Sequence, residues 1–358
     1  MCWRRLFQCA ASELLPWNPT DNRKEFKALS GERMIAGKER NEHLPLRGRL
    51  APSPTGALHL GNARSFLIAW LSIRSRGGTV VLRMEDLDHP KVKAGAAEQA
   101  LADLRWLGLD WDEGPDVGGP HVPYVQSQGV DHYAAARDRL LAKGLIYPCV
   151  CSRTDVEAAQ SAPHAGEDGP RYPGTCRDRF ASFDEAAATL PVGRLPAWRF
   201  RAPDEEIGFV DGFCGEISAN VAERDGDFVL ARHREGAGYM LGVVVDDARM
   251  GITEVLRGDD LLPATPRQLL LYRALGLAAP AFVHVPLVVG PDGRRLAKRH
   301  GDTRIATLRE QGMPPEQVVG MLANWCGWAA LGESITPADL IKRFDLCKLP
   351  KEPVVLAV

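Results

Sequence analysis

The stretch Arg49-Leu50-Ala51-Pro52-Ser53-Pro54-Thr55-Gly56-Ala57-Leu58-His59-Leu60-Gly61-Asn62 decides the fold of this chain. It begins as a short strand that Pro52 stops, passes through a turn rich in Pro and Gly, and enters a helical pattern at His59. That pattern runs to the stop at residues 76–78, and the β-branched residues 79–84 then indicate a second strand. Strand, loop, helix and strand in this order predict the opening unit of a parallel α/β domain.

Composition and periodicity divide the rest of the chain into segments. Residues 1–46 are polar and aperiodic, which predicts a disordered N-terminal extension. Residues 47–148 hold the first half of the α/β domain, and residues 228–302 hold its second half, where helix and strand patterns resume. Between the two halves, residues 149–227 are predicted to form an insertion, irregular and rich in Pro and Gly to about residue 211. Residues 303–358 have apolar positions at helical spacing and predict a helical C-terminal region.

The overall composition is that of an ordinary globular protein, with 45% hydrophobic and 25% charged residues. A formal net charge of −2 excludes nucleic-acid binding through overall positive charge, so any such binding requires local basic patches. The eight cysteines are unevenly spaced and do not indicate a disulfide framework. The sequence has neither a run of about 18 apolar residues nor a secretory signal, so we expect a cytoplasmic protein without a membrane span. Nothing in the sequence requires more than a monomer.

The strand-to-helix junction is the first candidate functional feature. A helix that begins beside a sheet edge presents unpaired N–H groups and the positive end of its dipole, which suits a polyphosphate. His59 adds a hydrogen-bond donor, and Gly61 lets a nucleotide approach the backbone. Taken alone, this His-Leu-Gly-Asn sequence is also compatible with an ordinary surface turn. The chain contains no G-x-x-x-x-G-K-[ST] sequence, which excludes a Walker loop as the means of binding ATP.

The second candidate feature is the basic loop Gly293-Arg294-Arg295-Leu296-Ala297-Lys298-Arg299-His300-Gly301. Its glycines bracket a segment with several cationic side chains. Such a loop can close on a triphosphate and neutralise charge in the transition state of adenylate formation. Taken alone, the loop is also compatible with a solvated basic turn or with a contact to a nucleic-acid backbone.

Together and in this order, the two features resemble the HIGH and KMSKS signatures of class I aminoacyl-tRNA synthetases. Residues 49–56, 83–86 and 253–258 also resemble stretches of glutamyl-tRNA synthetases, and the resemblance extends from about residue 47 to about residue 328. It implies an α/β fold, namely the Rossmann-type parallel-sheet catalytic domain of that class with a zinc-binding insertion and a short helical C-terminal region. The sequence departs from the signatures at Asn62, the last HIGH position, and at Ala297, where serine is common and a hydroxyl is lost.

The resemblance implies a set of site residues at matching positions. Arginine side chains would pair with the carboxylates of glutamate, Glu85 would hold its ammonium group, and Tyr239 would add a hydroxyl and a ring wall. The implied glutamate-binding residues are Arg49, Leu50, Ala51, Pro52, Ser53, Glu85, Tyr239 and Arg257. The implied catalytic residues are His59, Asn62 and Lys298, and the implied ATP-binding residues are His59, Gly61, Asn62, Arg295 and Lys298. Mg²⁺ is expected with the ATP phosphates.

A group of cysteines in the predicted insertion is the third candidate feature. Cys149, Cys151 and Cys176 offer three soft ligands, and a tetrahedral zinc site needs a fourth. From the residues alone, zinc binding and incidental thiols are about equally supported. The resemblance to glutamyl-Q tRNA(Asp) synthetases implies a structural zinc site that uses Cys-x-Cys with Tyr-x-x-x-Cys, which makes Tyr172 the fourth ligand. His164 is a rival for that position.

The length of the tail separates two related functions. Only about 60 residues follow the basic loop, which is too few for the helical anticodon-binding region of a glutamyl-tRNA synthetase. The resemblance therefore favours glutamyl-Q tRNA(Asp) synthetases, which activate glutamate with ATP and attach it to the queuosine in the anticodon of tRNA(Asp). The implied partners are ATP, L-glutamate and tRNA(Asp) carrying queuosine. Two alternatives stay open: a glutamyl-tRNA synthetase that charges a tRNA 3′ end, and an inactive paralogue that binds tRNA or glutamate.

Overall fold

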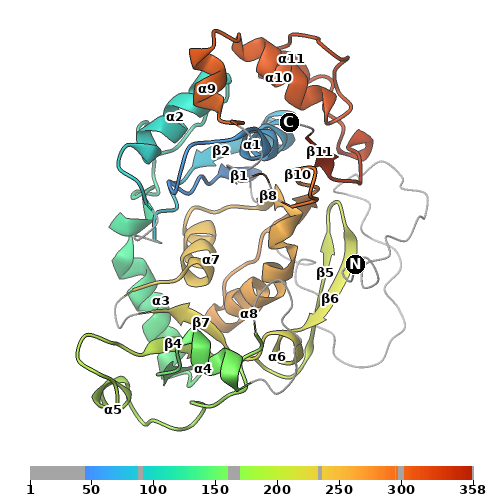
Figure 1. Cartoon of the computed structure of the whole chain (residues 1–358). Coiled ribbons are helices and arrows are strands. Elements are labelled where there is room, and N and C mark those ends of the chain that lie inside the picture. The colour runs from blue at the N-terminus through green and yellow to red at the C-terminus, as the bar shows by residue number, and fades with distance from the viewer. Residues whose placement is uncertain are drawn as a thin grey trace.

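A parallel β-sheet forms the centre of the molecule (Figure 1). The computed structural model describes residues 45–87, 92–159, 170–232, 236–294, 296 and 302–356. The strand order in the sheet is β2-β1-β8-β9, and all three pairings are parallel. The strands are β1 (Arg47–Leu50), β2 (Thr79–Leu82), β8 (Glu254–Gly258) and β9 (Ala281–Val285). The predicted strand–helix–strand opening and the α/β class are confirmed.

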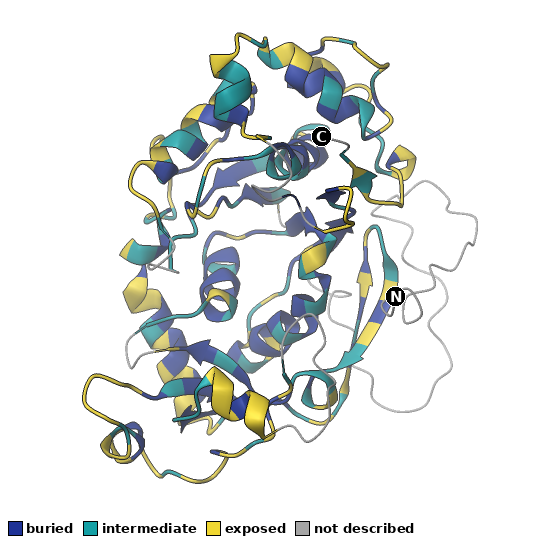
Figure 2. Ribbon diagram, in the orientation of Figure 1, coloured by how far each residue is buried: buried dark blue, intermediate teal, exposed yellow. Residues whose placement is uncertain are grey.

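Helices cover both faces of this sheet because alternate strand residues enter two separate cores. Val80 and Leu82 pack in the core on the side of α1 (Leu60–Arg74), whereas Val81 between them packs in the other core. The second core is closed by α7 (Tyr239–Arg249) and α8 (Thr265–Leu275). Figure 2 shows buried residues on both sides of the central strands, as a sheet covered on two faces requires.

The described part of residues 303–358 packs on the α1 side of the sheet. Val318, Leu322 and Leu340 are fully buried there against residues of α1 and β2. Two short strands, β10 (Val288–Val289) and β11 (Val354–Val355), also pair in parallel in this region. The helices on this side are α2 (Ala96–Trp106), α9 (Ile305–Glu310), α10 (Pro315–Asn324), α11 (Pro337–Leu340) and the 3-10 turn η6 (Leu346–Lys348).

The predicted insertion is more regular than its Pro- and Gly-rich sequence suggested. A three-stranded antiparallel sheet, β3-β4-β7, joins residues just before, within and just after residues 149–227. The ring pairs Phe183–Trp198 and Phe200–Phe228, with centroids 5.0 and 5.1 Å apart, pack this small sheet into the core that α7 and α8 also enter. Short strands supported by aromatic packing carry a weak periodic signal, which is why the sequence looked irregular.

Figure 1 shows the short helices of this region near the small sheet and a hairpin to the right of it. The strands are β3 (Ile146–Cys149), β4 (Ala197–Phe200) and β7 (Phe228–Ala231), together with the hairpin β5 (Glu206–Asp211) and β6 (Gly215–Asn220). The helices are α3 (Val130–Ala142), α4 (Arg153–Ala158), α5 (Phe183–Ala188) and α6 (Val221–Arg224). The 3-10 turns η3 (Gln126–Gln128) and η4 (Asp259–Ala264) complete the described elements.

The sequence also led us to expect a disordered N-terminal extension and no membrane span. Apart from residues 45 and 46, the predicted N-terminal extension lies outside the described residues. Among the helices of the described ranges, none has the combined length and apolar character that crossing a bilayer requires.

Candidate active site

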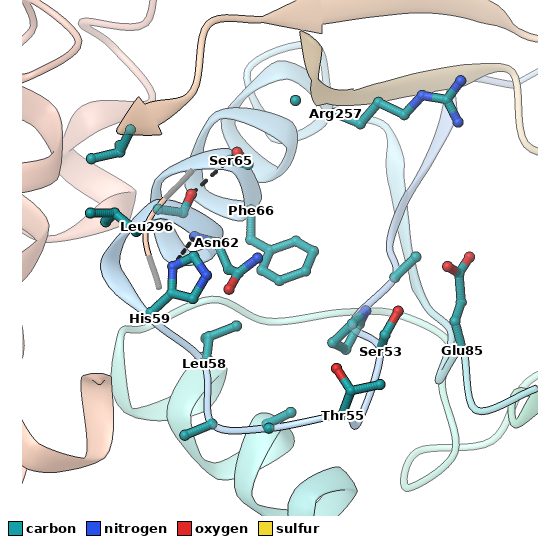
Figure 3. A pocket seen from close by; sticks show the side chains of 18 of the residues that line it. Ser53, Thr55, Leu58, His59, Asn62, Ser65, Phe66, Glu85, Arg257 and Leu296 are labelled. Carbon is teal, nitrogen blue, oxygen red and sulfur yellow. Dashed lines mark hydrogen bonds between the residues drawn. The ribbon is translucent and has the colours of Figure 1, made fainter. Parts of the chain in front are cut away.

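A cleft of about 960 Å³ opens at the carboxyl ends of the four parallel strands. Ala51 follows β1, Glu85 follows β2, Gly258 ends β8, and Leu287 follows β9; all four residues line the cleft. Open parallel α/β sheets bind their ligands at this edge because the connecting loops diverge there. Figure 3 shows His59 and Asn62 at the start of α1 on one side of the cleft, with Glu85 and Arg257 on the other.

The start of α1 forms the first side of the cleft. His59 caps the helix, and its Nδ1 accepts a hydrogen bond from the backbone N–H of Asn62 at 3.3 Å. The proton of the neutral imidazole is therefore on Nε2, which makes that nitrogen a donor. A Cβ at Gly61 would lie 3.2 Å from the His59 ring, so a side chain there would crowd both the histidine and an incoming ligand. The predicted residues His59, Gly61 and Asn62 all line the cleft.

The chain on either side of the basic loop meets this same helix start. The backbone N–H of Leu60 donates to the carbonyl of Thr303 at 3.0 Å, and that of Ile305 donates to the carbonyl of Leu58 at 2.9 Å. Leu296 and Asp302 also line the cleft. The predicted loop residues Arg295, Ala297 and Lys298 lie outside the described residues. The meeting of Lys298 with His59 at one nucleotide therefore stays a prediction.

A buried ionic network forms the second side of the cleft. Arg83 is fully buried and donates to Asp247 Oδ1 at 2.7 Å and to Glu85 Oε1 at 2.9 Å. Arg49 Nε lies 3.7 Å from the same Asp247 oxygen, and its Nη1 donates to the carbonyl of Leu256 at 3.2 Å. Burial raises the pKa of Glu85, and the positive charges of Arg83 and Arg49 oppose that rise. The network fixes a carboxylate and an arginine, Glu85 and Arg49, at the cleft wall.

Arg257 on β8 also lines the cleft and is held from behind by several acceptors. Its Nε donates to His284 Nε2 at 2.9 Å, and its Nη2 donates to Thr265 Oγ1 at 2.9 Å and to Gln268 Oε1 at 2.8 Å. Its Nη1 is buried and has no hydrogen-bond partner among the described residues. Tyr239, the first residue of α7, stands at the cleft wall with 37% of its surface exposed. The arrangement leaves one guanidinium nitrogen ready for an anionic ligand.

Most of the predicted glutamate-binding residues therefore line one cleft, but Leu50 does not. Its side chain is 1% exposed and packs in the core on the α1 side, because neighbouring residues of a strand point to opposite faces. The sequence interpretation also missed Lys93, Asp260 and Arg304, which line the cleft. They come from connecting segments that have no periodic pattern, and no local sequence signal marks them.

The third predicted feature, the cysteine group, is brought together at the end of β3. The sulfur atoms of Cys149, Cys151 and Cys176 lie within 4.8 Å of one another. The hydroxyl of Tyr172 lies 3.3 Å from Cys149 Sγ and 3.8 Å from Cys151 Sγ, and it accepts from the backbone N–H of Cys176 at 2.8 Å. His164 lies outside the described residues. Three thiols and a phenol thus converge on a point that could hold a metal ion.

A buried arginine lies against this group. Arg199 Nε donates to Cys149 Sγ at 3.2 Å, and its guanidinium carbon lies 3.6 Å from the centroid of the Tyr172 ring. Its Nη1 donates to the carbonyl of Asp227 at 2.8 Å, which holds the group in place. Arg199 thus holds the Cys149 sulfur and the Tyr172 ring in place from one side.

Comparisons with known proteins match nearly all of the described chain. The family described as tRNA synthetases class I (E and Q), catalytic domain, matches residues 45–356. The chain is 54% identical over 308 residues to the glutamyl-Q tRNA(Asp) synthetase of Symbiobacterium thermophilum, a match that covers 86% of this chain and 94% of that protein. It is 48% identical over 310 residues to the protein of the same name from Nitratidesulfovibrio vulgaris, covering 87% and 95%.

Glutamate–tRNA ligases are also similar, with lower identity. The chain is 42% identical over 313 residues to the glutamate–tRNA ligase of Heliobacterium modesticaldum, covering 87% of this chain and 62% of that protein. Among solved structures, a glutamate tRNA ligase from Elizabethkingia meningosepticum in complex with its amino acid superposes with a TM-score of 0.74. That pair is 31% identical, and the match covers 87% of this chain and 67% of that chain.

Proposed function

This chain belongs to the family of class I tRNA synthetase (E and Q) catalytic domains, among the proteins named glutamyl-Q tRNA(Asp) synthetase, and we propose that it activates glutamate with ATP and transfers it to the queuosine of tRNA(Asp). It is accordingly an ATP-dependent ligase that forms an aminoacyl ester through an adenylate. The observation that carries the proposal is one cleft with a helix start suited to phosphates on one side and buried arginines on the other.

The first step joins glutamate to AMP. An oxygen of the α-carboxylate attacks the α-phosphorus of ATP, the bond from that phosphorus to the α,β-bridging oxygen breaks, and pyrophosphate leaves. Mg²⁺ bound to the ATP phosphates would neutralise part of their charge. The N-terminus of α1, His59 and Asn62 stabilise the charge that develops on the α-phosphate. Lys298 from the basic loop is assigned to the leaving pyrophosphate. The protein supplies position and charge, so no side chain needs to act as a nucleophile.

The arginine side of the cleft holds glutamate during this step. Arg49 and Arg257 pair with its carboxylates, Glu85 accepts from its ammonium group, and Tyr239 walls the pocket. Backbone and side-chain atoms of Ala51, Pro52 and Ser53 border the same space. Buried arginines suit this role because each guanidinium offers a rigid fork to a carboxylate and is always charged.

The second step transfers glutamate to tRNA. A hydroxyl of queuosine attacks the carbonyl carbon of the adenylate, an ester forms and AMP leaves. The choice of tRNA(Asp) with queuosine as acceptor is supported by the two relatives named glutamyl-Q tRNA(Asp) synthetase. Their matches to this chain, at 48% and 54% identity, span 95% and 94% of their lengths. The proposal includes a monomer that acts in the cytoplasm, where ATP and tRNA are available.

An ATP–pyrophosphate exchange assay without tRNA tests the first step. We expect label from pyrophosphate to enter ATP in the presence of glutamate, because the residues assigned to glutamate and the start of α1 line one cleft of this chain. Aspartate and glutamine serve as matched controls and are expected to give little exchange. The absence of exchange at every glutamate concentration would instead identify an inactive paralogue.

The acceptor is tested with labelled glutamate and tRNA(Asp) stripped of its terminal CCA. We expect labelling to persist on this substrate and to disappear when the tRNA lacks queuosine. The 42% identity to a glutamate–tRNA ligase makes 3′-end charging the second candidate. Labelling that requires the CCA end and ignores queuosine would establish that second function.

Cys149, Cys151, Cys176 and Tyr172 are further assigned to one structural Zn²⁺, supported by the convergence of their four donor atoms. When bound, the ion would tie the end of β3 to the segment between α4 and α5, and none of its four ligands lines the cleft. Tyr172→Phe removes one ligand and keeps the ring, so we expect zinc affinity to fall about tenfold or more. Competition with a chelator and the absorption of the Co²⁺-loaded protein measure this loss.

His164→Ala is the matched variant for the fourth ligand. Its zinc affinity and Co²⁺ spectrum are expected to equal those of the unmodified protein. The reverse pattern, with His164→Ala weakened and Tyr172→Phe unchanged, would make His164 the ligand and Tyr172 only a neighbour.

A further inference from the structure

Behind Arg257 lies a chain of hydrogen bonds that the reaction described above does not use. Arg257 on β8 and His284 on β9 are direct partners in the parallel pairing of the two strands. Asp211 ends strand β5, and its Oδ2 lies 2.6 Å from His284 Nδ1. His284 and the Asp211 side chain have no exposed surface. The β5–β6 hairpin is thus linked to the cleft through one imidazole.

The surroundings of Asp211 fix which nitrogen of His284 carries the proton. Asp211 Oδ1 accepts from the backbone N–H groups of Phe213, Cys214 and His284 at 3.0, 2.9 and 3.1 Å. A carboxylate held by several donors is charged and acts only as an acceptor, so His284 Nδ1 must donate to it. Nε2 then carries a lone pair, which accepts from Arg257 Nε at 2.9 Å. Burial lowers the pKa of His284 to about 4, which agrees with a neutral ring.

All the acceptors that hold Arg257 are therefore neutral. Besides His284, its partners are the Thr265 hydroxyl, the Gln268 amide oxygen and, at 3.4 Å, the carbonyl of Leu261. Within the described residues no carboxylate forms an ion pair with Arg257. Arg83 differs, since two carboxylates contact it directly, and Arg49 lies 3.7 Å from Asp247. In the part of the chain that the structure describes, the charge of Arg257 is thus not compensated by an ion pair, and its buried Nη1 has no hydrogen-bond partner.

We propose that Asp211 and His284 are positioning residues: they fix the orientation of Arg257 without neutralising it, so that the cleft selects a carboxylate over a carboxamide. A carboxylate partner in place of His284 would cancel the charge that a substrate anion needs. The neutral His284 ring, with its proton fixed on Nδ1, accepts from Arg257 Nε and leaves Arg257 Nη1 to meet the substrate carboxylate. The inference rests on the proposed function only in taking a carboxylate of glutamate as the group that meets Arg257.

Asp211→Asn tests the tautomer. The asparagine oxygen can keep the three backbone donors, so its amide N–H₂ faces His284 Nδ1 and forces the proton onto Nε2. Two donors, Nε2–H and Arg257 Nε–H, then face each other. In the exchange assay we expect kcat/KM for glutamate to fall about 100-fold with KM for ATP within about threefold, and the preference for glutamate over glutamine to shrink.

A matched pair at position 284 separates positioning from folding. His284→Gln places an amide oxygen where Nε2 lies, so it can still accept from Arg257. We expect its kcat/KM for glutamate to fall by no more than about fivefold. His284→Asn can still donate to Asp211 but does not reach Arg257. We expect its kcat/KM for glutamate to fall about as far as that of Asp211→Asn. Thermal unfolding of each variant checks that it folds.

Several outcomes would overturn the inference. If Asp211 and His284 had a merely structural role, their substitution would lower kcat/KM for glutamate and for ATP together. Equal losses of kcat/KM in His284→Gln and His284→Asn would also indicate a merely structural role. The ¹⁵N shifts of His284 report its tautomer without turnover, and an Nε2–H tautomer in the unmodified protein would also contradict it. If the unmodified protein gives no glutamate-dependent exchange, the proposed function fails, whereas normal exchange with unaffected variants refutes only the positioning role.

Discussion

Arg257→Gln is expected to lower kcat/KM for glutamate in the exchange assay by about 1,000-fold. The variant keeps a shorter, neutral hydrogen-bonding group but removes the one cleft arginine whose charge has no carboxylate partner among the described residues. Losing one member of a buried charge pair costs about 4 kcal/mol, which corresponds to that factor. The loss should appear mainly in KM for glutamate, with KM for ATP little changed, because the ATP side of the cleft is built on α1.

Arg105→Gln is the control for this experiment. Arg105 is a half-exposed arginine on α2 that pairs with Asp116 and stacks on Trp111, and it does not line the cleft. Its removal should leave the kinetic constants within about twofold, since exposed ion pairs contribute little. Equal effects of the two substitutions, or an Arg257→Gln enzyme with normal glutamate KM, would remove Arg257 from the substrate site.

Lys298→Ala is expected to slow glutamate activation by about 100-fold or more, with little change in KM for glutamate. A lysine that meets the leaving phosphates stabilises charge that exists mainly in the transition state, so its removal lowers kcat more than ground-state binding. The segments that flank the basic loop border the same cleft as His59, which supports this role. Pre-steady-state measurement of adenylate formation separates this step from product release.

The matched control for the loop is Lys348→Ala. Lys348 is an exposed lysine in η6 that pairs only at 4.0 Å with Asp345, away from the cleft. We expect an unchanged rate for this variant. A Lys298→Ala enzyme with an unchanged rate of adenylate formation would show that the basic loop does not act on the phosphates and that the cleft uses another cation.

The two sides of the cleft were predictable from sequence to different degrees. His59, Gly61 and Asn62 sit in a local strand–turn–helix pattern, whose periodicity and turn residues can be read within about 15 positions. Arg257 and Tyr239 had no such local signal, because a lone arginine or tyrosine is usually a surface or core residue. Only the resemblance to a family marked them, and the structure places both on the cleft wall.

His284 shows what the sequence interpretation missed and which signal was available. It stands in the apolar run of residues 282–285, where a polar residue at a fully buried strand position requires a partner. That signal predicts a hydrogen-bonded histidine but cannot name its partners, Asp211 and Arg257, which are 73 and 27 residues away. Leu50 was included for a related reason: a motif match does not tell which strand face a side chain takes, and its side chain packs in the core on the α1 side.

The sequence by itself determined the opening strand and helix of this protein and its parallel α/β class. These depend on interactions over a few residues and on the alternation of apolar positions. The tertiary structure alone decided which charges are compensated. Arg83, Arg49 and Arg257 look alike in the sequence, yet burial beside Asp247 and Glu85 neutralises the first, while neutral acceptors leave the charge of the third for a ligand. Electrostatic energy in a buried site depends on distances between residues far apart in the chain, which folding sets and local sequence does not.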